Sequence, residues 1–457
     1  MAWWIVTISL VTLSPTSEAI LRTGSSQTTE ADNVRRWLSW FGKDKAVEEA
    51  KAAYCIPRWD RMKRPHACRM QAGADCPMST MRTDESSMVY PGGATRCLSN
   101  TRPEYAFQVV PRSKSKLLLL FDGGGACWNK LTVDADACNK KSVIPMPLEG
   151  MMSNEGQNPF RNHTIVYVQY CSGDLHAGSV IHPFRDKDNG VVEQRGFENT
   201  GSAIAWAKAN LDPELESFVL AGQSAGAIAV QVWAWKALGE FHYQQARVIS
   251  DSYAGVFPQG FQGPVFSTLG VCKNDLLPPQ LADSCGRKDI TMSDVFVEAM
   301  RAYPRVAFAT VDSMYDVEQL SFYKKAALSM GRMPELVQFS KDGFAEKLKA
   351  ILRRYSAHAN HFAYIRPSSD HVYTTCNRLF NMSAFVNGRE RPLVEWLALF
   401  QQPAVGSLGD VCQDAGPGRF CGQALARRRT QPASGAAGSR QRRALDAPQD
   451  RWAAGRG

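Results

Sequence analysis

The pentapeptide Gly-Gln-Ser-Ala-Gly at residues 222–226 stands between two apolar segments, and it constrains the fold more than any other part of the chain. Residues 217–221 are an apolar run that predicts a buried strand, and residues 227–235 are an Ala-rich apolar run that predicts a buried helix. A strand, Gly-x-Ser-x-Gly and a helix in this order are typical of the nucleophile elbow of serine hydrolases, with a plain Gly-rich turn as the alternative. We therefore interpret Ser224 as a nucleophile at the carboxyl edge of a sheet.

A second Gly-rich segment follows another predicted strand. Residues 116–121 are apolar, and residues 122–128 read Asp-Gly-Gly-Gly-Ala-Cys-Trp. A hydrolase of this kind needs two backbone N–H donors for the oxyanion, one from the residue after the nucleophile and one from a Gly-rich loop after an earlier strand. We expect Ala225, Gly124 and Gly125 to supply them. The alternative, a phosphate-binding loop, requires Gly-x-x-x-x-Gly-Lys or Gly-x-Gly-x-x-Gly, and this segment contains neither pattern.

Four segments, taken together with their order and spacing, resemble the pectin acetylesterase and Notum carboxylesterase family. They are Phe-Asp-Gly-Gly-Gly-Ala-Cys-Trp (121–128), Gln-Tyr-Cys-Ser-Gly-Asp-Leu-His-Ala-Gly (169–178), Gly-Gln-Ser-Ala-Gly (222–226) and Ser-Asp-Ser-Tyr-Ala-Gly (250–255). The resemblance extends from about residue 97 to about residue 400. It implies an α/β-hydrolase fold, no cofactor, and an acid and a base that follow two later strands in the chain order Ser, Asp, His.

The acid is expected after a strand that residues 305–311 predict. The family's acid lies in a segment similar to Tyr-Asp-x-x-Gln, which matches residues 315–319 and therefore implies Asp316. Asp312 and Asp251 are the alternatives, because each follows a predicted strand. Asp312 also suits the cap of a following helix, and Asp251 suits a role in orienting the loop beside the elbow.

The base is expected after a strand at residues 361–366. His371 stands in the loop after that strand, where the histidine of an α/β-hydrolase belongs, and the family's histidine lies in a similar loop. His358 and His361 precede or begin the strand and rank lower. We expect His371 to take the proton of the nucleophile, while the acid holds the imidazole tautomer and stabilises the imidazolium.

A metal site is an alternative for three residues near the same edge, Asp174, His176 and His182. These residues lack the fixed helical spacing of a zinc motif such as His-Glu-x-x-His. We interpret them as pocket wall or loop structure, and we expect neither a metal nor a cofactor.

The alternation of strands and helices over residues 97–400 predicts an α/β-hydrolase-type, mainly parallel sheet flanked by helices. We expect this domain to follow a signal peptide at 1–19 and an N-terminal, Cys-containing extension at 20–96, in which residues 33–54 predict an amphipathic helix. A C-terminal extension, 401–457, ends in a disordered Arg-rich tail. Residues 256–304 resemble an inserted lid, whose apolar residues either line an acyl pocket or belong to the core.

Secretion is expected from the apolar N-terminal run and the small-x-small site at Ser17-Glu18-Ala19, with an uncleaved anchor as the alternative. Twelve cysteines suit an oxidising compartment, and no Cys-x-x-Cys is present. No later segment is long and apolar enough to span a bilayer, so we expect no stable membrane insertion. Close spacing in the sequence suggests the disulfides Cys127–Cys138, Cys272–Cys285 and Cys412–Cys421. The glycosylation sequons are Asn162-His163-Thr164 and Asn381-Met382-Ser383.

The net charge of +9 comes mostly from the end of the chain, because residues 422–457 hold eight arginines and two aspartates. This tail has no apolar periodicity and is expected to be disordered, although binding to anionic glycans or membrane surfaces is an alternative. Basic residues interleaved with aromatic ones are absent, so we expect no nucleic-acid partner.

The sequence therefore predicts a secreted serine carboxylesterase that works through an acyl-enzyme intermediate. Its expected partner is an acylated polysaccharide, which it deacetylates, or an acylated protein, as for Notum. A glycan-binding protein that has kept the hydrolase fold without catalysis and a serine peptidase are further alternatives. The sequence leaves the oligomeric state and the acyl chain length open.

Overall fold

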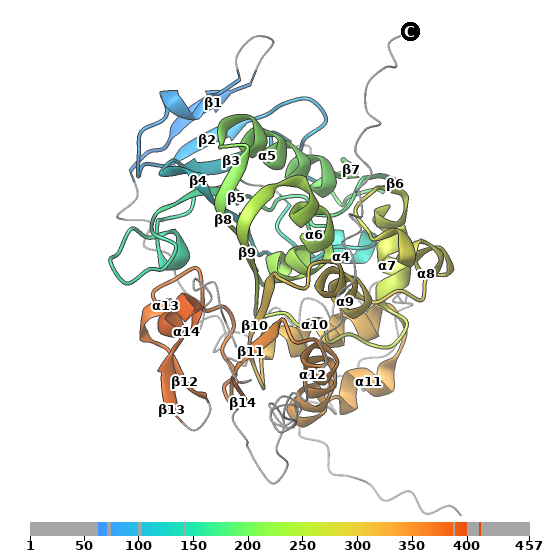
Figure 1. Ribbon diagram of the computed structural model, residues 1–457. Helices are drawn as coiled ribbons and strands as arrows, with labels where there is room; N and C mark the ends of the chain where they lie inside the picture. Colours follow the sequence, from blue (N-terminus) through green and yellow to red (C-terminus); the bar gives the residue numbers. More distant parts are fainter. Residues whose placement is uncertain are drawn as a thin grey trace, which may run out of the picture. The chain divides into compact units, whose positions relative to one another are not determined.

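The computed structural model of the protein describes residues 63–70, 75–98, 103–140, 143–386, 389–399 and 411–412 (Figure 1). These residues all belong to one unit of the chain, which ends at Cys421. The expected signal peptide, the helix expected at 33–54, the basic tail and Cys421 of the expected Cys412–Cys421 pair are not among the residues described.

A ten-stranded sheet forms the centre of the described part of the chain, in the order β1-β2-β3-β5-β4-β8-β9-β10-β11-β14. All neighbours from β5 to β14 pair in parallel, and β3 is antiparallel to both β2 and β5. The strands are β1 (His66–Arg69), β2 (Ser87–Tyr90), β3 (Phe107–Val110), β4 (Ser113–Phe121), β5 (His163–Val168), β8 (Glu214–Gln223), β9 (His242–Asp251), β10 (Ala307–Ser313), β11 (His361–Arg366) and β14 (Val411–Cys412). The predicted fold class is therefore confirmed.

The central strands are apolar because both faces of the sheet are covered. In β4, Leu117 and Leu119 pack in one apolar cluster, and Leu118 and Leu120 pack in another. This alternation follows from the two-residue period of a strand, which points successive side chains to opposite faces. Continuous apolar runs without polar alternation, such as the one at 116–121, are the sequence signal of such strands.

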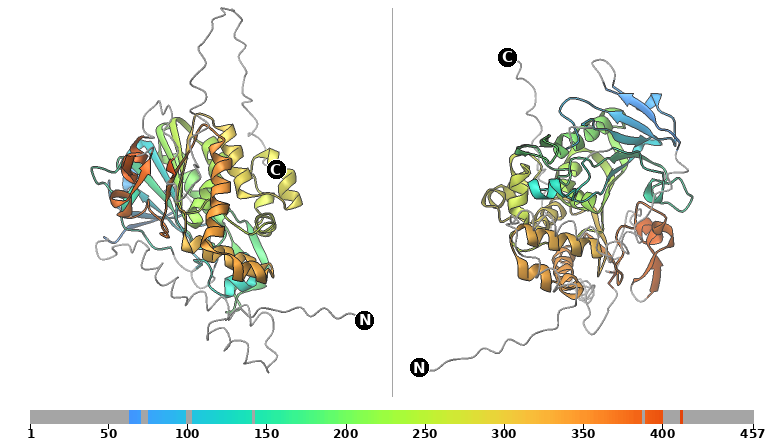
Figure 2. Two further views of the ribbon diagram at one scale, coloured as in Figure 1. Left: turned by 90° about the horizontal axis from the view of Figure 1, so that it is seen from below. Right: turned by 180° about the vertical axis from the view of Figure 1, so that it is seen from behind.

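Helices lie on both sides of the sheet (Figure 2). The cluster that contains Leu119 also contains side chains of three helices, α5 (Gly196–Asn210), α6 (Ala225–Glu240) and α9 (Met292–Ala302). The cluster that contains Leu120 includes side chains of α13 (Arg378–Asn381) and α14 (Leu393–Leu399). Three more helices lie between α9 and α13 in the sequence. They are α10 (Val317–Ser329), α11 (Met333–Gln338) and α12 (Lys341–Ser356).

The first two strands come from the segment that the sequence assigned to an N-terminal extension. Residues 66–69 and 87–90 are β1 and β2, and β2 pairs with β3 of the central sheet. The backbone carbonyl of Cys76 also accepts a hydrogen bond of 2.9 Å from Trp206 Nε1 on α5. The signal for these strands is weak because each has only four residues and β1 is largely exposed.

The inserted residues 256–304 form α7 (Gln262–Thr268), α8 (Ala282–Arg287) and α9, with short 3-10 turns between them. Phe266 on α7 and Leu276 are buried in the core. Other residues of this insert line an apolar pocket, so its apolar side chains are divided between the core and a pocket wall.

Disulfides connect four cysteine pairs among the described residues. The two predicted pairs Cys127–Cys138 and Cys272–Cys285 are confirmed, and the other two are Cys68–Cys76 and Cys97–Cys171. Within the part of the chain that the structure describes, no helix combines the length and the apolar character needed to cross a bilayer.

Candidate active site

Ser224 occupies the turn between β8, which ends at Gln223, and α6, which begins at Ala225. Its backbone has φ +54° and ψ −119°, and its N–H donates a 2.9 Å hydrogen bond to the carbonyl oxygen of Asp251 at the end of β9. A positive φ is uncommon for a residue with a side chain, and such strained conformations concentrate at functional sites. The geometry is the one that a nucleophile elbow requires.

The two glycines of the elbow are needed because the turn packs directly on β4. A Cβ atom on Gly222 would lie 2.3 Å from the carbonyl oxygen of Gly226, and one on Gly226 would lie 2.2 Å from the carbonyl oxygen of Phe121. Both distances are far below contact distance, so any side chain here would push the serine away from the sheet edge.

The Gly-rich loop after β4 is fixed through its carbonyl groups. The oxygen of Gly124 accepts a 2.7 Å bond from Asn139 N, and the oxygen of Gly125 accepts a 3.0 Å bond from Tyr170 Oη. In a trans peptide the C=O and the next N–H point in opposite directions, so the first bond turns the N–H of Gly125 away from Asn139. Gly125 has φ +73°, and a Cβ there would lie 2.3 Å from the carbonyl oxygen of Ala137.

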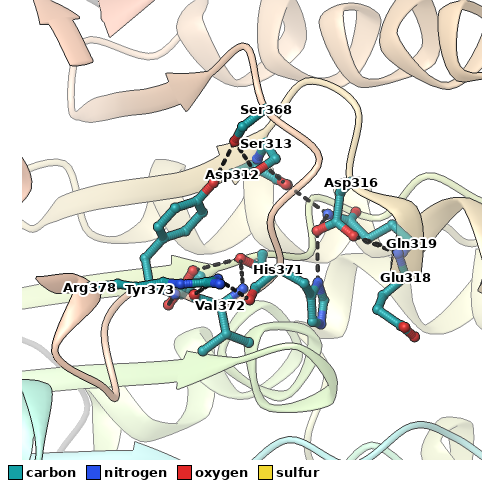
Figure 3. Close-up of polar contacts among 12 residues, drawn as sticks. Asp312, Ser313, Asp316, Glu318, Gln319, Ser368, His371, Val372, Tyr373 and Arg378 are labelled. Carbon is teal, nitrogen blue, oxygen red and sulfur yellow. Dashed lines mark hydrogen bonds and ion pairs between the residues drawn. The ribbon is translucent and has the colours of Figure 1, made fainter. Parts of the chain in front are cut away.

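His371 lies in the loop after β11, and its Nδ1 is 2.7 Å from Oδ2 of Asp316 (Figure 3). Both side chains are buried. Asp316 is the N-cap of α10, because its Oδ1 accepts bonds of 2.9 Å from Glu318 N and 3.0 Å from Gln319 N. The cap of this helix is therefore Asp316 and not Asp312, and the interpretation of Asp312 as the cap is wrong.

Asp312 lies near the end of β10 and accepts hydrogen bonds from two residues that follow it in the chain. Its Oδ1 accepts 2.7 Å bonds from Gln319 Nε2 and from Ser313 N. Burial, together with the charge of Asp316 nearby, raises the pKa of Asp312 well above its usual value. Asp312 is therefore a weaker acid in this site than a free aspartic acid.

Asp251 organises the backbone of the loop that carries His371. Its Oδ2 accepts bonds of 2.9 Å from Tyr373 N, 2.7 Å from Thr374 N and 2.7 Å from the Thr374 hydroxyl, while Oδ1 accepts 2.8 Å from Ser252 Oγ. A buried carboxylate that accepts backbone N–H groups fixes the path of the chain around it. Asp251 therefore makes the contacts of a residue that orients a loop. This was the alternative to the acid role in the sequence analysis.

The loops that carry Ser224 and His371 meet at the same end of the sheet. Gln223 and Asp251 are paired across β8 and β9, one residue from the turn that holds Ser224. The loop after β11 is attached to both, through Asp251 as described and through a hydrogen bond from Thr375 Oγ1 to Gln223 Oε1.

The electrostatics of His371 reflect two opposing effects. Burial of the imidazole lowers its pKa, whereas the charge of Asp316 and the hydrogen bond to it raise the pKa. The second effect prevails and raises the pKa of His371 to about 9.

An apolar pocket opens beside Ser224. It contains about 430 Å³ that no protein atom fills, including its mouth toward solvent. Ser224, Ala225 and Gly125 belong to its lining, whereas Gly124 does not. The other lining residues are mainly apolar and aromatic, and they are Ala126, Cys127, Trp128, Leu175, Ile228, Tyr253, Phe257, Phe261, Val265, Leu269 and Phe322.

Comparison with protein families decides the classification. Residues 86–361, more than half of the chain, match the family described as Pectinacetylesterase. The chain belongs to the pectinacetylesterase family. The matched region of this pectinacetylesterase family member contains Ser224 and Asp316 and ends at the first residue of β11, before His371.

Solved structures of the Wnt deacylase Notum from Drosophila have a similar fold. Crystal form II gives a TM-score of 0.50 at 16% identity and covers 70% of this chain and 94% of that chain. Crystal form I gives 0.48 at 16% identity, with 69% and 93% covered. The likeness of crystal form II shows the shared fold alone. A search of curated protein sequences found no significant match.

The three residues weighed as metal ligands make hydrogen bonds to different partners in this pectinacetylesterase family member. Asp174 accepts a 2.7 Å bond from Gly196 N, His176 Nε2 lies 2.9 Å from the carbonyl oxygen of Asp122, and His182 Nε2 lies 2.6 Å from Gln194 Oε1. Burial lowers the pKa of His176 to about 4. Among the described residues, no group of three or more His, Cys, Asp or Glu side chains is placed to hold a metal ion.

Sequence reasoning missed several residues of this site. Phe322 on α10 lines the pocket, and no motif or periodicity marks it for that position. Tyr253 and Trp128 also line the pocket, and they are different because they stand in the segments Ser-Asp-Ser-Tyr-Ala-Gly and Gly-Gly-Gly-Ala-Cys-Trp, so that signal was available.

Proposed function

We propose that this member of the pectinacetylesterase family is a serine carboxylesterase. In this proposal Ser224 Oγ attacks the ester carbonyl carbon while His371 takes its proton, and the protonated His371 then passes that proton to the departing alcohol. His371 then deprotonates a water molecule, which attacks the acyl carbon of the acyl-enzyme. The bond from that carbon to Ser224 Oγ breaks, the carboxylic acid leaves, and His371 returns the proton to Ser224 Oγ. Asp316 keeps the imidazole in the required tautomer and stabilises its charged form.

The oxyanion that forms in both steps is assigned to backbone N–H donors of Ala225 and the Gly124–Gly125 segment. The N–H of the first residue of a helix has no partner within the helix, which suits Ala225 for this role. The helix N-terminus also favours negative charge. The contacts of the Gly124 and Gly125 carbonyl groups support the assignment, because they hold the loop rigid before substrate arrives.

The proposal is carried by the pocket that Ser224 shares with Ala225 and Gly125, and the buried Asp316–His371 pair supports it. An ester bound with its acyl group in this pocket would place the carbonyl carbon at the serine hydroxyl. Membership of a family named for an esterase supports the same reaction class.

The pocket lining favours an apolar acyl group longer than acetyl. An acetyl group is small and its recognition does not require several aromatic walls, whereas Phe257, Phe261 and Phe322 all border this space. We therefore place deacylation of a lipid-modified partner, which the sequence ranked second, ahead of polysaccharide deacetylation. Deacetylation remains the second candidate, because the family takes its name from it.

A series of p-nitrophenyl esters from acetyl to hexadecanoyl tests both the reaction and the acyl class. We expect kcat/KM to rise from acetyl toward the medium and longer chains and then to fall when the chain exceeds the pocket. Ser224→Ala should abolish turnover of every ester while the protein stays folded by circular dichroism. Turnover retained in Ser224→Ala contradicts the assigned nucleophile, and a maximum at acetyl contradicts the acyl class.

We further propose that the protein is secreted, with a signal peptide at 1–19 ahead of the extension 20–96, the domain 97–400 and the C-terminal region 401–457. Four disulfides among the described residues are typical of an oxidising compartment. Asn162 and Asn381 are both exposed, as glycosylation at these sequons requires. Edman sequencing of protein collected from the culture medium should start near residue 20, and treatment with peptide N-glycosidase should lower its mass.

A further inference from the structure

Asp122, the residue that follows β4, is the first member of a chain of hydrogen bonds across the edge of the sheet. Tyr167 Oη donates a 2.5 Å bond to Asp122 Oδ1. The carboxyl group of Asp122 also accepts hydrogen bonds from the backbone N–H groups of Gly123 and Tyr170 and from the side chain of Gln223. Burial raises the pKa of Asp122 to about 6, and these four bonds act in the opposite direction.

The amide of Gln223 continues the chain to the third loop. Its Oε1 accepts the hydrogen bond from Thr375 Oγ1, so its NH₂ group is the donor toward Asp122. Gln223 and Thr375 are each 8% exposed, which keeps water from competing for these bonds. An amide is suited to this place because one end donates and the other accepts.

Each member of the chain stands next to one part of the proposed catalytic apparatus. Asp122 directly precedes the Gly-rich loop, and Gln223 directly precedes Ser224. Thr375 lies four residues after His371, in the same loop. We infer that Gln223 is a positioning residue that links the oxyanion loop and the histidine loop to the nucleophile turn. This inference rests on the proposed function.

Other contacts hold each loop to the body of the protein. Asn139 binds the Gly-rich loop, and Asp251 binds the backbone after His371. These anchors keep each loop folded, and Asp251 also joins the histidine loop to the turn of Ser224 through its carbonyl oxygen, whereas the Gln223 bridge reaches the Gly-rich loop as well. Loss of the Gln223 bridge should therefore shift the loops relative to the serine by fractions of an ångström without unfolding them. A misplacement of about 1 Å costs on the order of 100-fold in rate.

Such a shift acts on the transition state more than on the bound ester. The oxyanion and the proton transfer exist only during the reaction, whereas the acyl group is held by the pocket. We expect Gln223→Leu, which keeps the volume and removes both hydrogen bonds, to lower kcat by about 10- to 100-fold with KM changed less than about threefold. Thr375→Val, which removes one bond, should have a smaller effect in the same direction.

The experiment compares these two variants with Thr375→Ser and with Thr164→Val on the p-nitrophenyl ester that wild-type protein hydrolyses best. Thr375→Ser keeps the hydroxyl and should restore most of kcat. Thr164→Val is the matched control, because Thr164 is a buried threonine whose hydroxyl donates a 2.6 Å bond to the carbonyl oxygen of Ser113 near the opposite end of β5. It should lower the melting temperature and leave kcat unchanged.

Hydrogen exchange provides a second readout that does not depend on turnover. Amides of the segment 371–376 should exchange faster in Gln223→Leu and Thr375→Val than in wild type or Thr164→Val. The inference is overturned if Gln223→Leu keeps the kcat of wild type or if only its KM changes. It is also overturned if amide exchange in the segment 371–376 is unchanged. The proposed function fails by a different result, which is turnover retained in Ser224→Ala, so the two failures are distinguishable. If Gln223→Leu does not fold, the pair Thr375→Val and Thr375→Ser decides the question.

Discussion

Asp316 uses one carboxylate oxygen to cap helix α10 and the other to bind His371. Its Oδ1 accepts the N–H groups of Glu318 and Gln319, while its Oδ2 lies 2.7 Å from His371 Nδ1. A residue held by its own helix in this way cannot rotate away from the imidazole without breaking the cap. Local secondary structure therefore preorganises Asp316, which suits the acid role that we propose for it.

Replacement of this acid should separate its two roles. Asn caps a helix about as well as Asp, so Asp316→Asn should keep the melting temperature close to that of wild type. Its NH₂ group favours the wrong imidazole tautomer, so kcat should fall by about 10⁴, as in other triads. Asp312→Asn is the matched control, because Asp312 Oδ1 binds Ser313 N and Gln319 Nε2, whereas His371 Nδ1 is paired with Asp316, and its kcat should stay within a few-fold of wild type. Measured kcat values that fall equally in both variants contradict the assignment of Asp316.

The pH dependence of kcat/KM should follow the titration of His371. The imidazole accepts a proton only when neutral, and its pKa is raised to about 9. Activity should therefore rise about tenfold per pH unit below that value and level off above it. Asp316→Asn removes the charge that raises the pKa, so the residual activity should reach its plateau at lower pH. Initial rates corrected for spontaneous ester hydrolysis provide the measurement. The account is contradicted if kcat/KM of Asp316→Asn falls on the acid side at the same pH as that of wild type.

Several parts of the fold were predictable because they depend on short-range patterns. The apolar runs at 116–121 and 217–221 announce strands buried on both faces, and the glycines at 222 and 226 announce a turn in close contact with the sheet. Asp316 and His371 were chosen differently, because the family resemblance pointed to them and periodicity did not. The structure places these two side chains in contact.

The remaining features depend on pairings that no local pattern encodes. The bond between Gln223 and Thr375 joins residues 152 positions apart. Phe322 lies on α10, which begins after Asp316, and it reaches the pocket because of the direction of this helix. A helical pattern in the sequence does not give that direction. The sequence did not predict strand β1, because its four residues are mostly exposed and therefore show no apolar run.

The walls of the pocket should set the acyl chain that the enzyme accepts. Val265 on α7 lines the pocket, so Val265→Phe should fill part of the space and lower kcat/KM for long esters by more than tenfold, with acetyl ester hydrolysis much less affected. Overpacking costs about 1–3 kcal/mol of stability, so a control for damage to α7 is needed. Phe266→Leu provides it, because Phe266 is buried on the same helix and is not among the pocket residues. A chain-length profile that changes equally in both variants contradicts the role of the pocket wall.

Tyr253 and Tyr355 form a matched pair for a prediction about stability. Both side chains are buried. Among the residues that the structure describes, the hydroxyl of Tyr253 has no hydrogen-bond partner, whereas that of Tyr355 donates to Gln231 Oε1 at 3.0 Å. A buried hydroxyl without a partner costs about 1–3 kcal/mol, so its removal should not weaken the fold.

We expect Tyr253→Phe to leave the free energy of unfolding unchanged or to raise it by up to about 1 kcal/mol. Tyr355→Phe should lower it by about 1–2 kcal/mol, because Gln231 then loses a partner in the core. Urea titrations followed by fluorescence, with equal slopes required of both variants, provide the comparison. A Tyr253→Phe variant destabilised as much as Tyr355→Phe would mean that a bound water satisfies the Tyr253 hydroxyl, and the pocket would then be less apolar than its lining indicates.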